Sequence, residues 1–320
     1  MVRERLERLL IFMKKKVIVF GGSGFIGSRL TKALLDKNYT VLVICRDKDK
    51  AIQRLGTHKN FHIRNMDIFN EPAIKKIFTK CDVVVNLIGK LFETQKGDFK
   101  KFHYLFPHLL AKNVPASKHL IHISALGVEK SAKTSLYAST KLAGQKAIIS
   151  NSKNYNILKP SLVFGEEDNF FNQFAKMAKT SPFLPLIGGG KTKFAPIYVE
   201  DLVKSILFLI EHNKKYKNKI FEAYGPKKVS FKQLLQFILK TIHKDRLLIP
   251  LPFSLAKAGA TVMNLFKIYR LTPDQVELLK YNNIGSKKYE NIDVLIGPLG
   301  NYKEIVPQYL LKSSLQGNSF

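Results

Sequence analysis

The sequence feature that most constrains the fold of this chain is a glycine-rich turn near its N-terminus. An apolar, β-branched run over Lys16–Phe20 leads into Gly-Gly-Ser-Gly-Phe-Ile-Gly at residues 21–27, and an apolar-periodic run follows. This order is typical of the strand, turn and helix that begin a dinucleotide-binding βαβ unit. Gly21 permits the tight turn, Gly24 lets the backbone approach a pyrophosphate, and Gly27 lets the helix pack against the strand. The alternative is a glycine-rich turn without a ligand.

Strand-like runs alternate with helical patterns along the first half of the chain, which predicts a parallel sheet. The expected strands are Val17–Phe20, Thr40–Cys45, Phe61–Arg64, Asp82–Leu87, His119–Ile123 and Tyr155–Lys159. The expected helices are Phe25–Leu35, Ala73–Phe78, Phe99–Lys112, Leu136–Ile149, Glu200–Ile210 and Phe231–Ile242. We therefore predict an α/β fold. It has a Rossmann doubly wound parallel sheet over residues 13–165 and a smaller C-terminal lobe over residues 166–320, some of whose segments return to the core.

The charge balance narrows the class of partner. The formal net charge is +29, from 53 Lys and Arg against 24 Asp and Glu, and only nine of these cations are Arg. Forked Arg contacts are the ones that read nucleic-acid bases, so we expect no nucleic-acid partner. Scattered lysines favour peripheral contact with an anionic membrane or an acidic protein surface. One hypothesis for the function is therefore a lysine-rich protein that binds nucleic acid or lipid, and it is less favoured than the two hypotheses given at the end of this section.

No metal site is expected. Cys45 and Cys81 have no metal-ligand spacing, and we expect buried, reduced thiols, as in a cytoplasmic or matrix-like compartment. Four histidines are interpreted as structural or solvated: His103, His108, His119 and His122.

Neither a membrane-spanning segment nor a signal peptide is expected. No uncharged run approaches the ~20 residues that a spanning helix needs, and Lys257 interrupts the nearest candidate, residues 247–266. The first twelve residues carry Glu4 and Glu7 and no small-residue cleavage site. Either Met1 or Met13 is the expected start.

The residue after the second expected strand indicates the cofactor. An acidic residue there would bind the adenosine ribose hydroxyl of NAD, whereas an Arg accommodates the 2′-phosphate of NADP. Arg46, with Lys48 nearby, therefore favours NADP(H) over NAD(H), although a solvated loop arginine is the alternative. Asp67 follows the third strand, where its carboxylate can accept a hydrogen bond from the adenine amino group. Gly89 follows the fourth strand and lets the backbone run along the cofactor.

A Tyr-Ala-Ser-Thr-Lys segment over residues 137–141 is the strongest catalytic candidate. Tyr137 and Lys141 share a helix face, and a lysine cation near a phenol is expected to lower the pKa of the phenol. Tyr137 would then transfer a proton near neutral pH, and Lys141 would also hold the nicotinamide ribose. Ser124 lies thirteen residues before Tyr137 and would bind a substrate carbonyl. An exposed helix pair without catalytic function is the alternative.

Together these motifs resemble the extended or atypical short-chain dehydrogenase/reductase superfamily, of the epimerase/dehydratase type. Lys159-Pro160-Ser-Leu-Val-Phe164-Gly also resembles its Arg-Pro-x-x-Val-Tyr-Gly segment beside the nicotinamide, with Lys159 and Phe164 as departures. The resemblance implies that Ser124, Tyr137 and Lys141 are catalytic. It implies a cofactor site built from Gly21, Gly24, Phe25, Ile26, Gly27, Arg46, Asp67, Ile68, Leu87, Gly89, Tyr137, Lys141 and Pro160.

A narrower resemblance covers roughly residues 14–285. Val-Val-Val-Asn-Leu-Ile-Gly at 83–89, Phe-Glu-Thr at 92–94, and Leu-Thr-Pro-Asp-Gln-Val at 271–276 are similar to the NADPH-binding accessory subunit of respiratory complex I and its bacterial relatives. That family is regarded mainly as a structural or assembly component, and some relatives are linked to ubiquinone biosynthesis. The resemblance implies respiratory-complex or quinone-pathway partners. It also implies a cytoplasmic protein, peripheral on the inner face of the respiratory membrane.

Two hypotheses therefore lead. In the first, the chain is an NADP(H)-binding structural or assembly component of the NADH:ubiquinone oxidoreductase or the quinone-biosynthesis machinery. In the second, it is a soluble NADP(H)-dependent oxidoreductase or epimerase that uses Ser124, Tyr137 and Lys141 on a carbonyl or nucleotide-sugar-like substrate. Whether the chain turns over a substrate is left open.

Overall fold

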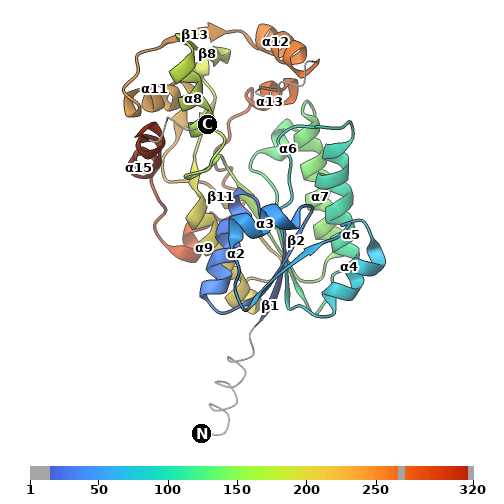
Figure 1. The fold of residues 1–320 in the computed structure, drawn as a ribbon. Coiled ribbons are helices and arrows are strands. Elements are labelled where there is room, and N and C mark those ends of the chain that lie inside the picture. Colours follow the sequence, from blue (N-terminus) through green and yellow to red (C-terminus); the bar gives the residue numbers. More distant parts are fainter. Residues whose placement is uncertain (1–14, 266–270, 316–320) are drawn as a thin grey trace.

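Seven parallel strands form the central sheet of the protein (Figure 1). The computed structural model describes residues 15–265 and 271–315, so the choice between Met1 and Met13 lies outside the described residues. The strand order is β11-β6-β5-β4-β1-β2-β3. The bounds are β1 Lys16–Phe20, β2 Thr40–Cys45, β3 Phe61–Asn65, β4 Val83–Asn86, β5 His119–Ile123, β6 Tyr155–Pro160 and β11 Lys219–Ala223. The predicted doubly wound α/β fold is confirmed. Each of the six expected strands begins and ends within one residue of the predicted positions.

The seventh strand comes from the second half of the chain. β11 pairs in parallel with β6, with Phe221 opposite Leu158. Sequence analysis did not predict this strand, because its five residues, Lys-Ile-Phe-Glu-Ala, include two charged side chains and give a weak strand pattern. The division of the chain at residue 165 stays a prediction.

Helices cover both faces of the sheet, so its strands are apolar on both sides. Val17 and Val19 of β1 pack into a core with α2 and α9, whereas Ile18 and Phe20 pack with α4 and α5. The helices around the sheet are α2 Phe25–Asp36, α3 Lys48–Leu55, α4 Glu71–Phe78, α5 Phe106–Asn113, α6 Val128–Ser131, α7 Leu136–Asn151, α9 Val199–Glu211, α10 Asn213–Tyr216 and α14 Asp293–Ile296.

The prediction of one regular helix over Phe99–Lys112 is partly wrong. Its first half is a π-helix, η1 Lys100–Leu105, which continues directly into α5. The carbonyl of His103 in this wide turn lies against Gly144 of α7, where any Cβ would collide with it. Sequence periodicity at 3.6 residues does not register such a local widening.

The second lobe has its own hydrophobic core, in which aliphatic side chains pack with several phenylalanine and tyrosine rings. Its elements are β7 Val163–Phe164, α8 Phe171–Thr180, β8 Phe183–Ile187, η2 Gly188–Gly190, β9 Lys193–Phe194, β10 Ile197–Tyr198, β12 Val229–Ser230, α11 Phe231–Thr241, β13 Leu247–Leu251, α12 Phe253–Leu265, α13 Pro273–Leu278 and α15 Tyr302–Leu315. Among the described residues, no helix is long and apolar enough to cross a bilayer.

Candidate functional site

The glycine turn joins β1 to α2 in a close backbone arrangement. Gly21 has a φ of +79°, and its carbonyl accepts a hydrogen bond of 3.0 Å from the Gly24 N–H. A Cβ on Gly27 would collide with that same carbonyl and would lie 2.7 Å from the Cα of Gly22. Only glycine at position 27 therefore lets α2 begin this close to the turn, which is the role expected from the sequence.

The turn lies at the point where the strand order reverses. β1 has β2 on one side and β4 on the other, so the crevice between the carboxyl ends of the strands opens here. The Leu87 N–H donates to the Phe20 carbonyl at 3.0 Å, and a Cβ on Gly21 would lie 3.2 Å from the Leu87 carbonyl carbon. Gly24 is exposed at the N-terminus of α2. This narrow, side-chain-free cradle fits a dinucleotide pyrophosphate.

The residues expected near the adenosine lie on the same edge of the sheet. Arg46 is exposed at the end of β2, and β2 runs parallel to β3, with Cys45 opposite Asn65. Asp67 follows β3 and is exposed; one carboxylate oxygen accepts from the Phe69 N–H at 3.0 Å. Ile68 is half-buried against the core under α4.

Lys141 is the buried cation of the site. Its side chain is only 5% exposed, and its Nζ donates to the carbonyl of Ile123 at 3.1 Å. A Cβ on Gly89 would lie 3.1 Å from this Nζ. The structure therefore brings Lys141, Gly89 and the carboxyl end of β5 together.

Tyr137 lies one turn before Lys141 on α7 and is partly buried. Its ring meets the His103 ring edge-on at 5.2 Å and the Phe99 ring edge-on at 5.7 Å. Burial raises the pKa of Tyr137 to about 12, and the Asp274 carboxylate adds to this effect. Burial lowers the pKa of Lys141 to about 8. The expectation that Lys141 lowers the pKa of Tyr137 is wrong for this structure, because loss of solvent outweighs any stabilisation of the phenolate.

Ser124 belongs to a different cluster. Its hydroxyl donates to Gln145 Oε1 at 2.9 Å, and Gln145 Nε2 donates to Glu129 Oε1 at 3.3 Å. The fully buried Lys159 ammonium donates to the same Glu129 oxygen at 2.6 Å and lies over the Tyr289 ring. No described contact joins Ser124 to Tyr137. Sequence analysis missed Gln145, although its position four residues after Lys141 on one helix face was a usable signal.

Two histidines of β5 and one of η1 are buried and neutral. His103 Nε2 accepts from the Lys90 N–H at 3.0 Å, and burial lowers its pKa to about 2. His122 Nδ1 pairs with the Asn86 amide nitrogen at 3.1 Å, and burial lowers its pKa to about 3. His119 Nε2 lies 2.7 Å from Asn156 Oδ1. Their burial and their hydrogen bonds within the protein support the interpretation that they are structural. Within residues 15–265 and 271–315, no three His, Cys, Asp or Glu side chains form a group that could hold a metal ion.

The second lobe contacts the N-terminus of α7 through Asp274. The carboxylate accepts from the Ser135 hydroxyl at 2.8 Å, the Leu136 N–H at 2.7 Å and the Tyr137 N–H at 3.2 Å. A carboxylate on the first N–H groups of a helix satisfies donors that have no partner within the helix. Asp274 therefore ties α13 to the segment that carries Tyr137. It lies in the Leu-Thr-Pro-Asp-Gln-Val segment, but the sequence pattern does not show what it contacts.

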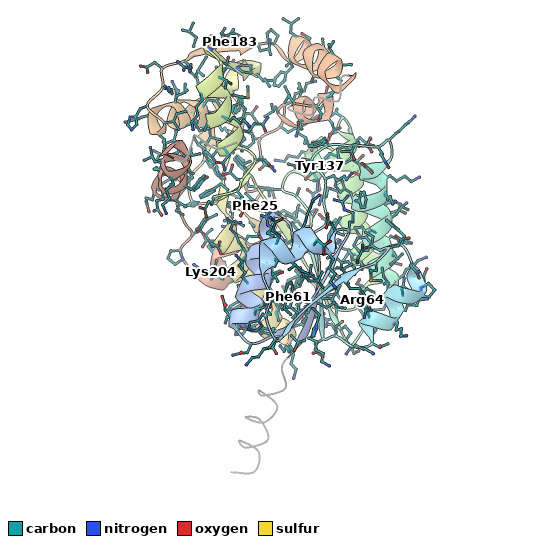
Figure 2. The ribbon with its side chains drawn as sticks, in the orientation of Figure 1. Phe25, Phe61, Arg64, Tyr137, Phe183 and Lys204 are labelled. Carbon is teal, nitrogen blue, oxygen red and sulfur yellow. The ribbon has the colours of Figure 1, made fainter. Side chains whose placement is uncertain are left out.

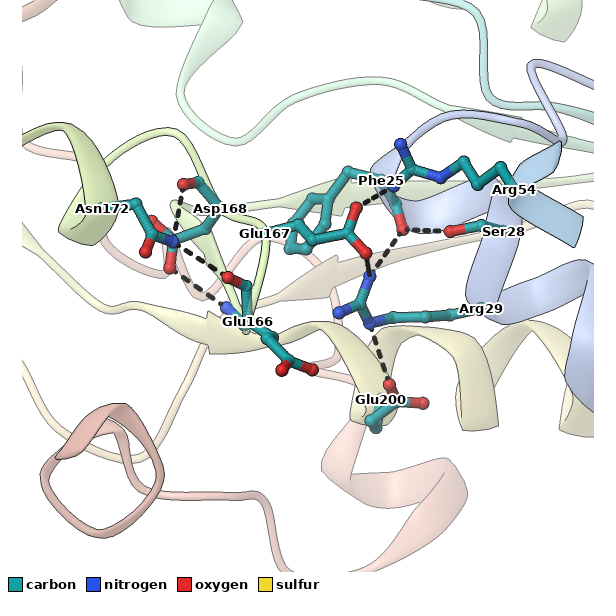
Figure 3. A network of polar contacts seen from close by, with 10 residues as sticks. Phe25, Ser28, Arg29, Arg54, Glu166, Glu167, Asp168, Asn172 and Glu200 are labelled. Atoms are coloured by element: carbon teal, nitrogen blue, oxygen red, sulfur yellow. Dashed lines mark hydrogen bonds and ion pairs between the residues drawn. The ribbon is translucent and has the colours of Figure 1, made fainter. Parts of the chain in front are cut away.

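A second connection lies beside the glycine turn (Figure 3). Arg29 of α2 pairs with Glu200 of α9 at 3.1 Å and with Glu167 at 3.8 Å, and its guanidinium lies 4.9 Å from the centre of the Phe25 ring. Arg54 of α3 also pairs with Glu167. Glu167 follows β7, so these ion pairs link the first two helices of the sheet domain to the second lobe.

Known proteins share both the sequence pattern and the fold. Residues 17–102 match the NAD dependent epimerase/dehydratase family, and residues 128–261 match the RmlD substrate binding domain. The chain is 29% identical to NADH dehydrogenase [ubiquinone] 1 alpha subcomplex subunit 9, mitochondrial, of Arabidopsis thaliana, over 91% of this chain and 77% of that protein. It is 30% identical to the protein of the same name from Mus musculus, over 73% of this chain. It spans only 63% of that mouse protein, which is less than two thirds.

Solved structures show the same architecture. UDP-glucuronic acid 4-epimerase from Bacillus cereus, solved with UDP-glucuronic acid and NAD, superposes with a TM-score of 0.71 at 20% identity, over 93% of this chain and 99% of that one. dTDP-glucose 4,6-dehydratase from Bacillus anthracis gives a TM-score of 0.71 at 14% identity, over 94% and 97%. At these identities the likeness concerns the fold. With the glycine cradle and the matched segments, it shows that the chain has the nucleotide-binding α/β fold of NAD-dependent epimerases and dehydratases.

Proposed function

We propose that this chain is an NADP(H)-binding protein that serves as a structural or assembly component of the NADH:ubiquinone oxidoreductase or of the quinone-biosynthesis machinery. The observation that carries the proposal is its likeness, over 91% of its length, to a protein named as a subunit of that oxidoreductase. In this role the bound dinucleotide stabilises the fold, and the second lobe and surface lysines meet the partners.

The charges at the end of β2 support NADP(H) over NAD(H). Arg46 and Lys48 are exposed there. The intervening Asp47 is engaged as the cap of α3: its carboxylate accepts from the Lys50 N–H at 3.1 Å and pairs with the Lys50 ammonium at 3.3 Å. Two cations and an engaged carboxylate suit a 2′-phosphate better than a ribose hydroxyl.

The arrangement of the Tyr137 site favours a structural role over turnover. A phenol with a pKa of about 12 is a weak proton acceptor or donor near neutral pH. The Ser124 hydroxyl donates to Gln145 and not toward Tyr137. Under this proposal, Tyr137 and Lys141 hold the nicotinamide half of the dinucleotide.

Reversal of one charge tests the cofactor. Arg46→Glu is expected to weaken NADPH binding about ten-fold or more, which is about 1.4 kcal/mol, with a smaller effect on NADH. Lys228→Glu, an identical charge change on the second lobe, is the matched control. Isothermal titration with both nucleotides measures the two affinities. Equal NADPH affinity in Arg46→Glu and the wild type would contradict the assignment of Arg46.

Gentle purification from the native cells tests the role. The expected result is about one NADPH per chain together with respiratory-complex or quinone-pathway subunits, identified by mass spectrometry. Tyr137→Phe is expected to retain the nucleotide, the partners and the cellular function. Loss of cellular function in a folded, nucleotide-bound Tyr137→Phe protein would reject the structural role.

A second candidate function is an NADP(H)-dependent oxidoreductase or epimerase acting on a carbonyl or nucleotide-sugar-like substrate. The observation that favours it is the buried Lys141 beside Gly89, one turn from Tyr137, in a fold shared with 4-epimerases. A bound nicotinamide dinucleotide would supply or accept hydride, and Tyr137 would move the proton of the substrate oxygen. A substrate that oxidises bound NADPH in the wild type but not in Tyr137→Phe would establish this activity.

We also propose that the protein works on the inner, cytoplasmic-side face of the respiratory membrane, in peripheral contact with anionic lipids. The net charge of +29 supports this location, because each lysine near an anionic surface contributes about 1 kcal/mol.

A further inference from the structure

The outer end of the second lobe carries exposed apolar side chains. β8 and β13 pair in parallel, with Leu247 opposite Phe183. Phe183, Leu247 and Ile249 are 47%, 73% and 44% exposed. Alternate residues of a strand point to one face, and paired residues share it, so these three side chains form one outward apolar surface. Figure 2 shows Phe183 at the end of the molecule, away from Phe25 and Tyr137.

The next helix extends this surface. α12 begins two residues after β13 and buries Ala256 and Ala260 against the lobe. Its exposed side carries Leu255 at 61% and Val262 at 54% exposure. Residues 258 and 259, also exposed, are Ala and Gly, so positions 255, 258, 259 and 262 form an apolar helix face at the spacing i, i+3, i+4, i+7. We call Phe183, Leu247, Ile249, Leu255 and Val262 the apolar tip.

The segments that carry the apolar tip are basic. Residues 171–187 and 240–262 hold six cations and one acid, Asp245, a higher ratio than the 53 to 24 of the whole chain. The cations are Lys176, Lys179, Lys240, Lys244, Arg246 and Lys257. From the neighbouring α13, Glu277 pairs with Lys257 at 2.8 Å and with Lys280 at 2.9 Å. The segments that carry the exposed apolar side chains therefore also carry an excess of cations.

This combination fits the surface of an anionic bilayer. Exposed leucine, isoleucine and phenylalanine side chains enter the boundary between headgroups and acyl chains, while lysines remain near the lipid phosphates. The cleft beside Leu91 and Gln173 and the cleft between α11 and α15 contain none of the residues of the apolar tip. Side chains that project in this way suit insertion into lipid better than a pocket for a partner's side chain.

We propose that the apolar tip is the membrane-docking face of the protein, and this inference rests on the proposed function for the presence of a membrane. β8, β13 and α12 lie together at the outer end of the lobe (Figure 1). Docking through them would direct the seven-stranded sheet and its cofactor cradle away from the lipid. The cofactor site would then stay open to the aqueous phase and to protein partners.

Vesicle flotation of the full chain tests this face. The vesicles contain equal parts of phosphatidylcholine and phosphatidylglycerol, with phosphatidylcholine alone as the uncharged comparison. The test variant is Phe183→Ser/Leu247→Ser/Ile249→Ser. The matched control is Leu105→Ser/Ile149→Ser/Val294→Ser, which removes side chains that are 41%, 39% and 55% exposed elsewhere. The test variant is expected to lose about ten-fold or more in partitioning, and the control to match the wild type.

The outcomes separate the two proposals. Flotation of the test variant equal to that of the wild type would overturn the docking face, because lysines alone would then explain binding. A second result would also overturn the docking face while leaving the proposed function intact. In that result the wild type binds neither kind of vesicle, yet it co-purifies with respiratory subunits. Equal NADPH affinity of both triple variants, measured in parallel, shows that each is folded.

Discussion

Lys141 shows how burial alters a single residue of the site. The ammonium lies inside the protein with the Ile123 carbonyl as its described hydrogen-bond partner, and no described carboxylate pairs with it. A buried cation without a counter-charge is costly, so its proton is held less tightly than in water. A dinucleotide with negative phosphates and ribose hydroxyls would relieve this cost, which is a physical reason for the site to retain its cofactor.

The pH dependence of stability tests this environment. The Lys141 pKa is about 8 in the folded chain and 10.5 in its ordinary state. Between these values the unfolded chain binds more protons, so the free energy of unfolding rises with pH across this window. Relative to Lys141→Met, the cofactor-free wild type is expected to gain up to roughly 3 kcal/mol between about pH 8 and about pH 10.5. Urea unfolding measures both proteins, and parallel pH profiles would contradict the assignment.

At the scale of elements, the contact between η1 and α7 positions the site. The π-turn presents the His103 carbonyl to Gly144, while the His103 ring packs against Tyr137 one turn from Lys141. Thr140 Oγ1 lies 3.3 Å from His103 Nδ1 and completes this contact. The separation of the two helices therefore depends on a missing Cβ, and the orientation of Tyr137 depends on that separation.

A pair of alanine substitutions tests this contact. Gly144→Ala places a Cβ against the His103 carbonyl and is expected to lower the free energy of unfolding by about 1–3 kcal/mol. Gly259→Ala on α12 is the control, because a Cβ there meets nothing within 4 Å. The control is expected to stabilise the protein by up to about 1 kcal/mol, since alanine favours helix. Equal effects of the two substitutions in urea unfolding would exclude the steric explanation.

At the scale of the whole molecule, several polar contacts hold the second lobe over the sheet, and two of them lie beside the expected dinucleotide site. Asp274 caps the helix that carries Tyr137, and Glu167 pairs with Arg54 and Arg29 beside the glycine turn. One connection lies at each side of the crevice where the strand order reverses. The lobe therefore influences both ends of the expected dinucleotide site.

Removal of the Asp274 carboxylate tests this coupling. Asp274→Ala leaves the first N–H groups of α7 without their acceptor and is expected to cost about 1 kcal/mol in stability. NADPH affinity is expected to fall as well, because Tyr137 moves with the start of α7. Asp274→Asn retains one acceptor oxygen and should show a smaller loss of both. Unchanged NADPH affinity in Asp274→Ala, at reduced stability, would limit Asp274 to a purely structural contact.

The sequence by itself determined the parts of this protein that depend on local order. A glycine-rich segment between an apolar strand and a helix has few alternative backbone conformations. The spacing of Gly21, Gly24 and Gly27 therefore predicted that they form the turn between β1 and α2. The six leading strands followed from apolar runs. Lys141 and Tyr137 were found because a separation of four residues on a helix has only one geometry.

Only the tertiary structure decided the rest, because it depends on contacts between distant residues. The seventh strand, residues 219–223, becomes a strand by pairing with β6. Asp274 reaches the start of α7 from more than a hundred residues away in sequence. The raised pKa of Tyr137 is the clearest case. Its neighbour Lys141 was visible in the sequence, but the burial that outweighs this neighbour arises only when η1, α7 and the second lobe pack together.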